Sequence, residues 1–293
     1  MLSRDSHTNT AKISSGIAII VSKVCHNNFS VIGGLRLASS KALWCASQRC
    51  DCSFGTALTQ ENSMSISPDK PTIVLVHGAF ADATGWQHVI LLLEAQGYFV
   101  VAVQNALTSL SDDIATTKRV IDAQSGPVVV VGHSYGGMVI TGAAAGNPHV
   151  KSLVYVAAYI PDLGEAIGQL NEMFSPPPLA TSIVPDAAGF LYVDRSKFHD
   201  VFCHDVPDAE ARIMAATQKP INSVSFGQSL EAVAWKEVPS WSIVAKADNA
   251  INPDLERFMS QRANATTIEV DASHVPFISQ PQVVVDVIKD AAQ

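Results

Sequence analysis

The sequence predicts an α/β fold in which helices cover both faces of a mostly parallel sheet. One observation is a series of short runs of valine, isoleucine and leucine that are apolar at every position. Strands buried on both faces have this pattern, whereas half-exposed strands alternate apolar and polar residues. A second observation is that segments of helical spacing separate these runs, and strands that alternate with helices form parallel sheets.

The first half of this pattern extends from Pro71 to Ile160. The expected strands are 71–78, 98–104, 127–132 and 150–160, and the expected helices are 84–97, 109–126 and 135–146. In the second of these helices Ser111 is the expected N-cap, and the acidic residues after it favour a helix N-terminus. The first two helices end at a glycine, a common C-terminal signal.

The alternation stops at Pro161 and resumes at Ser240. Residues 161–236 are rich in acidic residues, contain the sequence SPPP, and have helical pieces without strong strands. We therefore expect a helical cap inserted after the strand at 150–160. The expected strands 240–248 and 266–274 and the expected helices 252–263 and 280–292 complete the fold.

The first 63 residues differ in composition from the rest. Residues 1–60 contain six basic residues, two acidic residues and four of the five cysteines. This composition fits a targeting segment, a cysteine-rich knot, or an extension outside the mature fold with Met64 as the functional start. We favour the extension and expect residues 64–293 to form the folded domain. A cytoplasmic location is expected, and this segment leaves targeting or export open.

Charge and hydropathy argue against several classes of function. The formal net charge is −8 and no basic cluster offsets it, which argues against a nucleic-acid partner. No apolar run approaches the ~18–20 residues that a membrane span requires. No pair of cysteines has zinc-finger spacing, so no metal site is expected. The expected partner is a small molecule, and the sequence does not define an oligomeric state.

Ser134 lies in the sequence GHSYG, between an expected strand and an expected helix. The flanking glycines permit a sharp strand-to-helix turn in which the serine backbone is strained and neighbouring segments approach closely. The hydroxyl then stands above the carboxyl edge of the sheet, where the following helix N-terminus favours developing negative charge. This context predicts a serine nucleophile. The alternative is a glycine-rich turn with an idle serine.

A serine nucleophile requires a histidine base and an orienting acid, and after this type of turn the acid precedes the histidine. The nine histidines are His7, His26, His77, His88, His133, His149, His199, His204 and His274. Of these, His274 alone lies in the last strand-to-helix connection, so we expect it to be the general base. A purely structural role is the alternative.

Asp248 is the expected acid, because it ends the strand that precedes this connection and would meet the imidazole Nδ1 of His274. Asp162, just after the strand at 150–160, is the second candidate. Asp271 is too close to the histidine along the chain, and we expect it to shape the turn.

The oxyanion of a tetrahedral intermediate needs backbone N–H donors. The expected donors are Tyr135, directly after the serine, and Ala79, in the loop after the first strand, with Phe80 as the alternative to Ala79. We expect His77 to brace this loop. An apolar substrate pocket is expected from Phe80, Trp86, Phe190 and Tyr192, with core packing as the alternative.

Several segments resemble those of the α/β-hydrolase superfamily: HGAFADATGW, GHSYGG, LVYVAAYIPD, KAD and SHVPFISQP. They are most similar to the small esterase branch that includes plant methyl-ester esterases, hydroxynitrile lyases and bacterial serine esterases. The resemblance covers about residues 70–293. It implies an α/β-hydrolase sheet, a helical cap at about 161–236 and no cofactor. It also implies that Ser134, Asp248 and His274 form the catalytic triad and that Ala79 and Tyr135 are the oxyanion donors.

One position departs from the lyases of this branch, which have a lysine directly after the catalytic histidine. Val275 stands there in this chain, which disfavours lyase activity. The sequence therefore predicts a cofactor-independent serine hydrolase that cleaves a small carboxylic ester through an acyl-enzyme intermediate. The alternatives are the same triad acting on a lactone, an amide or a C–C bond, and a non-catalytic small-molecule receptor.

Overall fold

The computed structural model describes residue 67 and residues 69–293. The expectations for residues 1–63 concern a segment outside this range. Within the described residues, no helix is both long and apolar enough to cross a membrane.

A six-stranded, entirely parallel sheet forms the centre of the fold, in the order β2-β1-β3-β4-β8-β9. Its strands are β1 (Thr72–Val76), β2 (Val100–Val103), β3 (Val128–Ser134), β4 (Val150–Ala158), β8 (Ser240–Ala245) and β9 (Thr266–Val270). Every residue of β3 is buried. In β4 every residue except Lys151 is buried. The all-apolar runs at 127–132 and 150–160 are therefore central strands, as the sequence predicts, whereas the run at 98–104 forms the half-buried edge strand β2.

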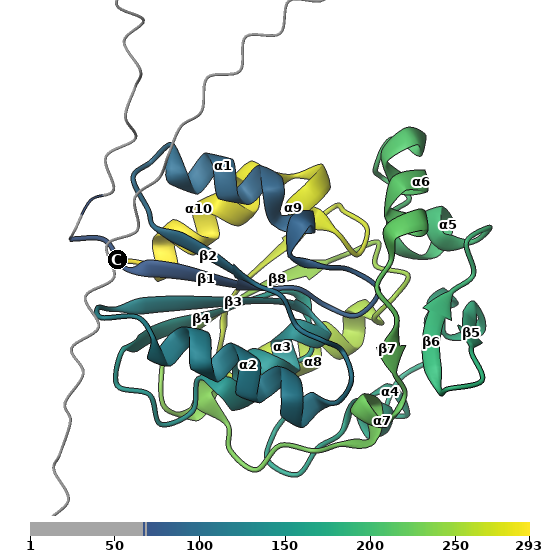
Figure 1. Cartoon of the computed structure of the whole chain (residues 1–293), viewed down its shortest axis with the longest axis horizontal. Helices are drawn as coiled ribbons and strands as arrows, with labels where there is room; N and C mark the ends of the chain where they lie inside the picture. Colours follow the sequence, from purple (N-terminus) through teal and green to yellow (C-terminus); the bar gives the residue numbers. More distant parts are fainter. Residues whose placement is uncertain (1–66, 68) are drawn as a thin grey trace, which may run out of the picture. The chain divides into compact units, whose positions relative to one another are not determined.

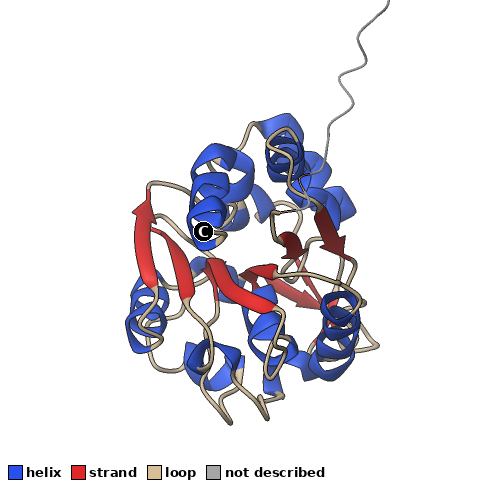
Figure 2. Cartoon of the chain, turned by 90° about the vertical axis from the view of Figure 1, so that its left-hand side faces the viewer, coloured by secondary structure: helices blue, strands red, loops and turns tan. Residues whose placement is uncertain are grey.

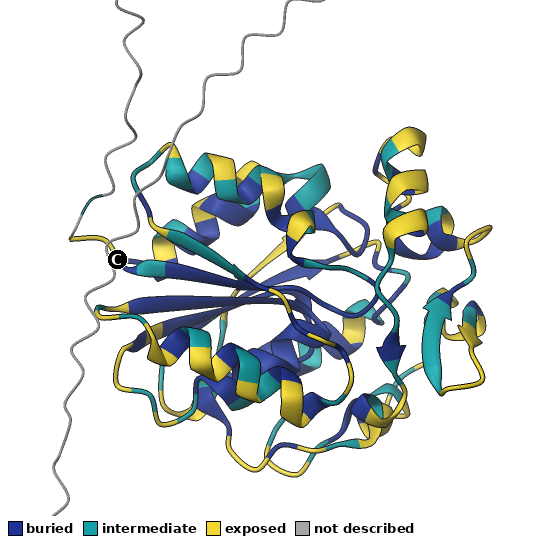
Figure 3. Cartoon of the chain, in the orientation of Figure 1, coloured by how far each residue is buried: buried dark blue, intermediate teal, exposed yellow. Residues whose placement is uncertain are grey.

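Helices cover both faces of this sheet (Figures 1 and 2). One face carries α1 (Gln87–Glu94), α9 (Pro276–Ser279) and α10 (Pro281–Ala291), and the other carries α2 (Leu110–Asp122), α3 (Tyr135–Ala143) and α8 (Pro253–Arg262). Short 3-10 helices are η1 (Ala83–Trp86), η2 (Pro178–Thr181) and η3 (Ala234–Lys236). The outer helices are buried toward the sheet and exposed on their other side (Figure 3). The predicted α/β architecture is confirmed.

The N-cap of α2 is Ser109, so the prediction of Ser111 was wrong. Ser109 has extended backbone angles (φ −160°, ψ 157°), and its side chain accepts a hydrogen bond from the backbone N–H of Asp112. A capping residue needs this non-helical backbone, whereas Ser111 lies inside the first helical turn. Two serines in near succession made the choice ambiguous from sequence.

The segment between β4 and β8 forms a cap beyond one end of the sheet (Figure 1). Its helices are α4 (Ile167–Asn171), α5 (Phe198–Phe202), α6 (Asp208–Thr217) and α7 (Val224–Gly227). It also contains a small antiparallel sheet of β5 (Ile183–Pro185), β6 (Phe190–Val193) and β7 (Ile221–Asn222). Strands this short have too few residues to show an alternating pattern, and the sequence did not predict them.

Candidate active site

Ser134 occupies the sharp turn between β3 and α3. Its φ of 54° and ψ of −124° lie in a region that non-glycine residues rarely adopt. The turn is tight because Gly136 passes directly over β1: a Cβ there would come within 2.7 Å of the carbonyl oxygen of Val76. The predicted strained turn is therefore present, and it exposes Ser134 to a cavity at the carboxyl edge of the sheet.

Asp248 and His274 meet at the same edge of the sheet. Asp248 lies three residues beyond the end of β8, and His274 lies four residues beyond the end of β9. His274 Nδ1 donates to Asp248 Oδ2 at 2.6 Å, and both side chains are almost fully buried. Because the donor is Nδ1, the other ring nitrogen, Nε2, is left without a proton in the neutral ring.

Backbone N–H groups hold the carboxylate of Asp248. Its Oδ1 accepts from the N–H of Ala250 at 2.6 Å and from that of Ile251 at 2.9 Å. The second candidate acid, Asp162, instead forms an ion pair with Lys236. Asp248 is therefore the predicted acid that the structure brings to His274.

Asp271 also has a partner other than His274. Its carboxylate is exposed and lies 2.7 Å from Lys246 Nζ. The described residues include no group of three or more histidine, cysteine, aspartate or glutamate side chains arranged to hold a metal ion.

A further carboxyl group, that of Glu256, lies buried beside Asp248. Glu256 Oε2 accepts from the N–H of Ala245 at 3.3 Å, and Oε1 receives no hydrogen bond from the described residues. Burial, together with the charge of Asp248, raises the pKa of Glu256 well above its usual range. Glu256 is therefore the neutral acid beside the charged Asp248. No sequence pattern singled out this residue.

His77 braces the loop after β1, as predicted. Its Nδ1 donates to the carbonyl oxygen of Gly78 at 2.9 Å, and its Nε2 accepts from the N–H of Asn105 at 3.0 Å. Burial lowers the pKa of His77 to about 4, so the ring stays neutral and keeps both bonds at neutral pH. The next residue in this loop, Ala79, faces the cavity, as does Phe80.

His133 packs against His274 rather than facing the cavity. Its Nε2 donates to the carbonyl oxygen of His274 at 2.8 Å, and the two rings lie 4.6 Å apart. Burial lowers the pKa of His133 well below its usual value. A neutral His133 therefore holds the backbone of His274 through this hydrogen bond, on the side away from the cavity.

Tyr135, the other expected oxyanion donor, is anchored through its hydroxyl group. The hydroxyl donates to Asp113 Oδ2 at 2.8 Å, and Asp113 Oδ1 accepts from the N–H of Leu107. Burial raises the pKa of Asp113. This anchor fixes the first residue of α3, whose backbone N–H follows Ser134 directly.

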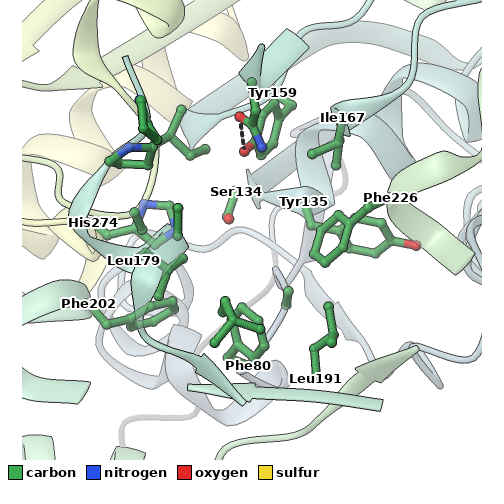
Figure 4. A pocket seen from close by; sticks show the side chains of 18 of the residues that line it. Phe80, Ser134, Tyr135, Tyr159, Ile167, Leu179, Leu191, Phe202, Phe226 and His274 are labelled. Atoms are coloured by element: carbon green, nitrogen blue, oxygen red, sulfur yellow. Dashed lines mark hydrogen bonds between the residues drawn. The ribbon is translucent and has the colours of Figure 1, made fainter. Parts of the chain in front are cut away.

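A cavity of about 350 Å³ lies between the sheet edge and the cap (Figure 4). Its wall is mostly apolar, and Ser134 and His274 both face it. The apolar side chains from the cap are Ile167, Leu179, Ile183, Leu191 and Phe226, with Phe202 beside His274. No hydrogen bond joins Ser134 Oγ to His274 in the described part of the chain, so proton transfer requires a closer approach of the two groups.

Three of the four predicted pocket residues were wrong; Phe80 alone lines the cavity. Trp86 is fully buried in the core, where its ring stacks 4.4 Å from that of Phe277. Phe190 and Tyr192 flank Leu191 on β6, and alternate residues of a strand face opposite sides. Leu191 faces the cavity, so its two neighbours do not. Alternation along β6 separates Leu191 from its two aromatic neighbours, and the fold of the cap decides which side faces the cavity.

The chain is similar to esterases of known sequence and structure. Methylesterase 2 of Arabidopsis thaliana is 28% identical over 258 residues, covering 76% of this chain and 96% of that protein. A pyrethroid hydrolase from Sphingobium faniae has a TM-score of 0.64 and 25% identity, covering 76% of this chain and 97% of its own. Polyneuridine aldehyde esterase, 18% identical, shares the fold with a TM-score of 0.67, covering 76% of this chain and 100% of its own.

These similarities agree on the class of enzyme: the chain is a serine-type hydrolase of carboxylic esters. Residues 73–287 match the alpha/beta hydrolase family, and the chain belongs to that family.

Proposed function

We propose that this enzyme hydrolyses an uncharged, apolar carboxylic ester, with Ser134 as nucleophile, His274 as general base and Asp248 as the acid that orients it. The observation that carries this proposal is the buried 2.6 Å pair of His274 and Asp248, whose histidine lines the same apolar cavity as Ser134. Methylesterase 2 is named for the hydrolysis of esters, which agrees with this chemistry.

In the first half of the reaction, Ser134 Oγ attacks the ester carbonyl carbon while His274 Nε2 takes the hydroxyl proton. The carbonyl π electrons move to the oxygen, and the N–H groups of Ala79 and Tyr135 bind the resulting oxyanion. Asp248 stabilises the imidazolium that forms. When the intermediate collapses, the C–O bond to the alcohol breaks, the leaving oxygen takes the proton from Nε2, and an acyl-enzyme remains.

Water completes the reaction by the same route. His274 Nε2 removes a proton from a water molecule, whose oxygen attacks the acyl carbon. The bond to Ser134 Oγ then breaks, and the serine regains its proton from His274. The products are the free acid and the original enzyme, so the reaction consumes one water molecule and needs no cofactor.

The cavity wall determines the proposed substrate class. Among the described residues that line it, none is lysine, arginine, aspartate or glutamate. Burying a charged group without a partner is strongly unfavourable, so a charged acyl or alcohol group is excluded. Val275 is fully buried next to His274 and adds no positive charge. An apolar ester instead gains free energy from the area that it buries.

Replacement of Ser134 with alanine tests this proposal. We expect Ser134→Ala to lower kcat for p-nitrophenyl butyrate by about 10⁴-fold or more, because the nucleophile is lost. Ser242→Ala is the matched control, since Ser242 is a buried serine of β8 that bonds Ser260 away from the cavity. Wild type and control should also react with a fluorophosphonate probe, and Ser134→Ala should not.

Two results would contradict the proposal. Turnover retained in Ser134→Ala, with circular dichroism showing a folded protein, would mean that another group is the nucleophile. Probe labelling of the wild type without turnover of any neutral ester would favour a receptor on a hydrolase fold.

A further inference from the structure

One polar pair interrupts the apolar wall of the cavity. The Tyr159 hydroxyl donates to Asn171 Oδ1 at 2.9 Å, and both residues line the cavity. Tyr159 follows β4 directly, and Asn171 is the last residue of α4 in the cap. The bond therefore joins the sheet edge to the cap, and Figure 4 shows it as a dashed line beside Tyr159.

The hydroxyl proton of Tyr159 fixes which way the Asn171 amide faces. Burial raises the pKa of Tyr159, so its hydroxyl keeps the proton and can donate it. The acceptor in the structure is Asn171 Oδ1, since an amide nitrogen cannot accept. The Asn171 Nδ2 group is then the other end of the amide. It makes no hydrogen bond within the described residues, and its two N–H donors remain for a molecule in the cavity.

A free N–H donor in an apolar cavity discriminates between ligands. An ester without an acceptor at this point removes water from Nδ2 and replaces it with nothing, which is unfavourable. An ester with an oxygen there restores the hydrogen bond. The negative charge of Asp248 also contributes to the raised pKa of Tyr159, and the same charge disfavours a carboxylate as that acceptor.

We propose that Asn171 is a specificity-determining residue that selects esters carrying a second, uncharged oxygen acceptor: a ketone, ether or hydroxyl oxygen away from the scissile ester. This inference rests on the proposed function, because it concerns the substrate of the same cavity. In the bound complex the acceptor oxygen receives a hydrogen bond from Asn171 Nδ2, and Tyr159 holds the amide in place.

A series of matched esters measures this selection. The reference substrate is butyl hexanoate, and its analogues carry one ketone at successive acyl carbons beyond the α-carbon, or one ether oxygen in the alcohol chain. Acid release in a pH-stat gives kcat/KM for each. For the best-placed oxygen we expect the wild type to prefer the analogue by about two- to tenfold, the range of one neutral hydrogen bond.

Two variants of Asn171 remove the donor in different ways. Asn171→Asp keeps an acceptor for the Tyr159 hydroxyl but has no N–H, and Asn171→Leu has neither group. In both variants the ratio of kcat/KM for the oxygen-bearing analogue to kcat/KM for butyl hexanoate should fall to one or below. Both variants should still hydrolyse butyl hexanoate. Leu179→Met is the matched control: it alters the apolar wall, so absolute rates change, but the preference remains.

The outcomes separate this inference from the function on which it rests. A preference that survives in both Asn171 variants, or that is absent from the wild type at every oxygen position, overturns the inference and leaves ester hydrolysis intact. Failure of the wild type to hydrolyse butyl hexanoate and every analogue would overturn both.

Discussion

Asp248 accepts hydrogen bonds from two backbone N–H groups and from His274. Both of its oxygens are therefore held by donors, which fixes the orientation of the carboxylate toward the imidazole. The imidazole thus meets a fixed negative charge on its Nδ1 side, although neither residue is exposed. Such a charge favours the imidazolium that forms when the serine proton is transferred.

We expect Asp248→Asn to lower kcat by about 10⁴-fold, because an amide in place of the carboxylate reverses the proton position on the imidazole. The His274 ring would carry its proton on Nε2, where it cannot accept one from Ser134. Asp271→Asn is the control, since Asp271 is exposed at the same sheet edge and pairs with Lys246. Steady-state kinetics that place both variants within tenfold of wild type would contradict the role of Asp248.

Glu256 should make the stability of the protein depend on pH. Its folded-state pKa is raised above the unfolded value of about 4.5 by burial and by the charge of Asp248, with the hydrogen bond from Ala245 N–H and the charge of Arg257 opposing. The folded protein then holds a proton that the unfolded chain releases as pH rises. The free energy of unfolding therefore decreases above pH ~4.5, by up to about 1.4 kcal/mol per pH unit, until Glu256 ionises in the folded state.

Glu256→Gln removes this dependence, because an amide of nearly the same shape does not titrate. In urea unfolding, the variant should match wild type near pH 4 and be more stable at about pH 8. Glu269→Gln is a control of opposite sign, because hydrogen bonds from Arg257 lower the pKa of Glu269. That variant should be less stable than wild type at about pH 8 and equal to it at low pH. A stability difference for Glu256→Gln that does not change with pH would contradict a neutral Glu256.

At the scale of elements, a substitution of Gly136, just after the turn between β3 and α3, would have two opposing effects on stability: higher helix propensity and overpacking. Gly136→Ala gains about 1 kcal/mol of helix propensity in α3. The added Cβ would lie 2.7 Å from Val76 O and 2.8 Å from His77 O, and overpacking of this kind loses about 1–3 kcal/mol. We expect the second effect to prevail, and the displaced loop after β1 to lower kcat as well.

Gly126→Ala is the control for this substitution, because a Cβ at Gly126 would meet nothing within 4 Å. Thermal unfolding and kcat should both stay near wild type in that variant. If Gly136→Ala were as stable and as active as Gly126→Ala, the close approach of Val76 and His77 would not explain why position 136 is a glycine.

The elements that sequence predicts well are those whose signal is local. The central strands β3 and β8 are largely buried, so their composition alone identifies them; Ser134 ends β3 and Asp248 follows β8. His274 follows β9, an exposed edge strand whose signal is its place in the α/β alternation. The cavity wall has no such signal. Leu191 and Phe226 face it because of how the short cap elements fold over the sheet. Phe190 and Tyr192 were chosen for their aromatic character, which does not reveal the side of β6 on which a residue lies.

At the scale of the whole molecule, the cap contacts both loops that carry the His274–Asp248 pair. His204 Nε2 donates to the carbonyl oxygen of Ala247, the residue before Asp248. The cap residue Asp205 accepts from the N–H of Ser273, the residue before His274, at 3.0 Å. The cap therefore does more than enclose substrate: it supports the two loops whose positions the chemistry requires.

Phe202 extends this support into the core. Its ring lies 4.9 Å from that of His274 and 4.9 Å from that of Phe198, its neighbour on α5. Both phenylalanines are buried in the hydrophobic cluster that includes the central sheet. We therefore expect cap and sheet to unfold in a single transition, with Phe202→Ala and Phe198→Ala each losing about 3–5 kcal/mol.

Activity should separate these two variants. Phe202→Ala removes the ring that packs on His274, so kcat/KM should decrease, whereas Phe198→Ala leaves that contact and should keep its activity at temperatures where it is folded. Urea unfolding followed by tryptophan fluorescence and by far-ultraviolet circular dichroism gives the stabilities, and the two signals should coincide. Separate transitions, or equal losses of kcat/KM in both variants, would mean that the cap folds apart from the sheet or acts on His274 by another contact.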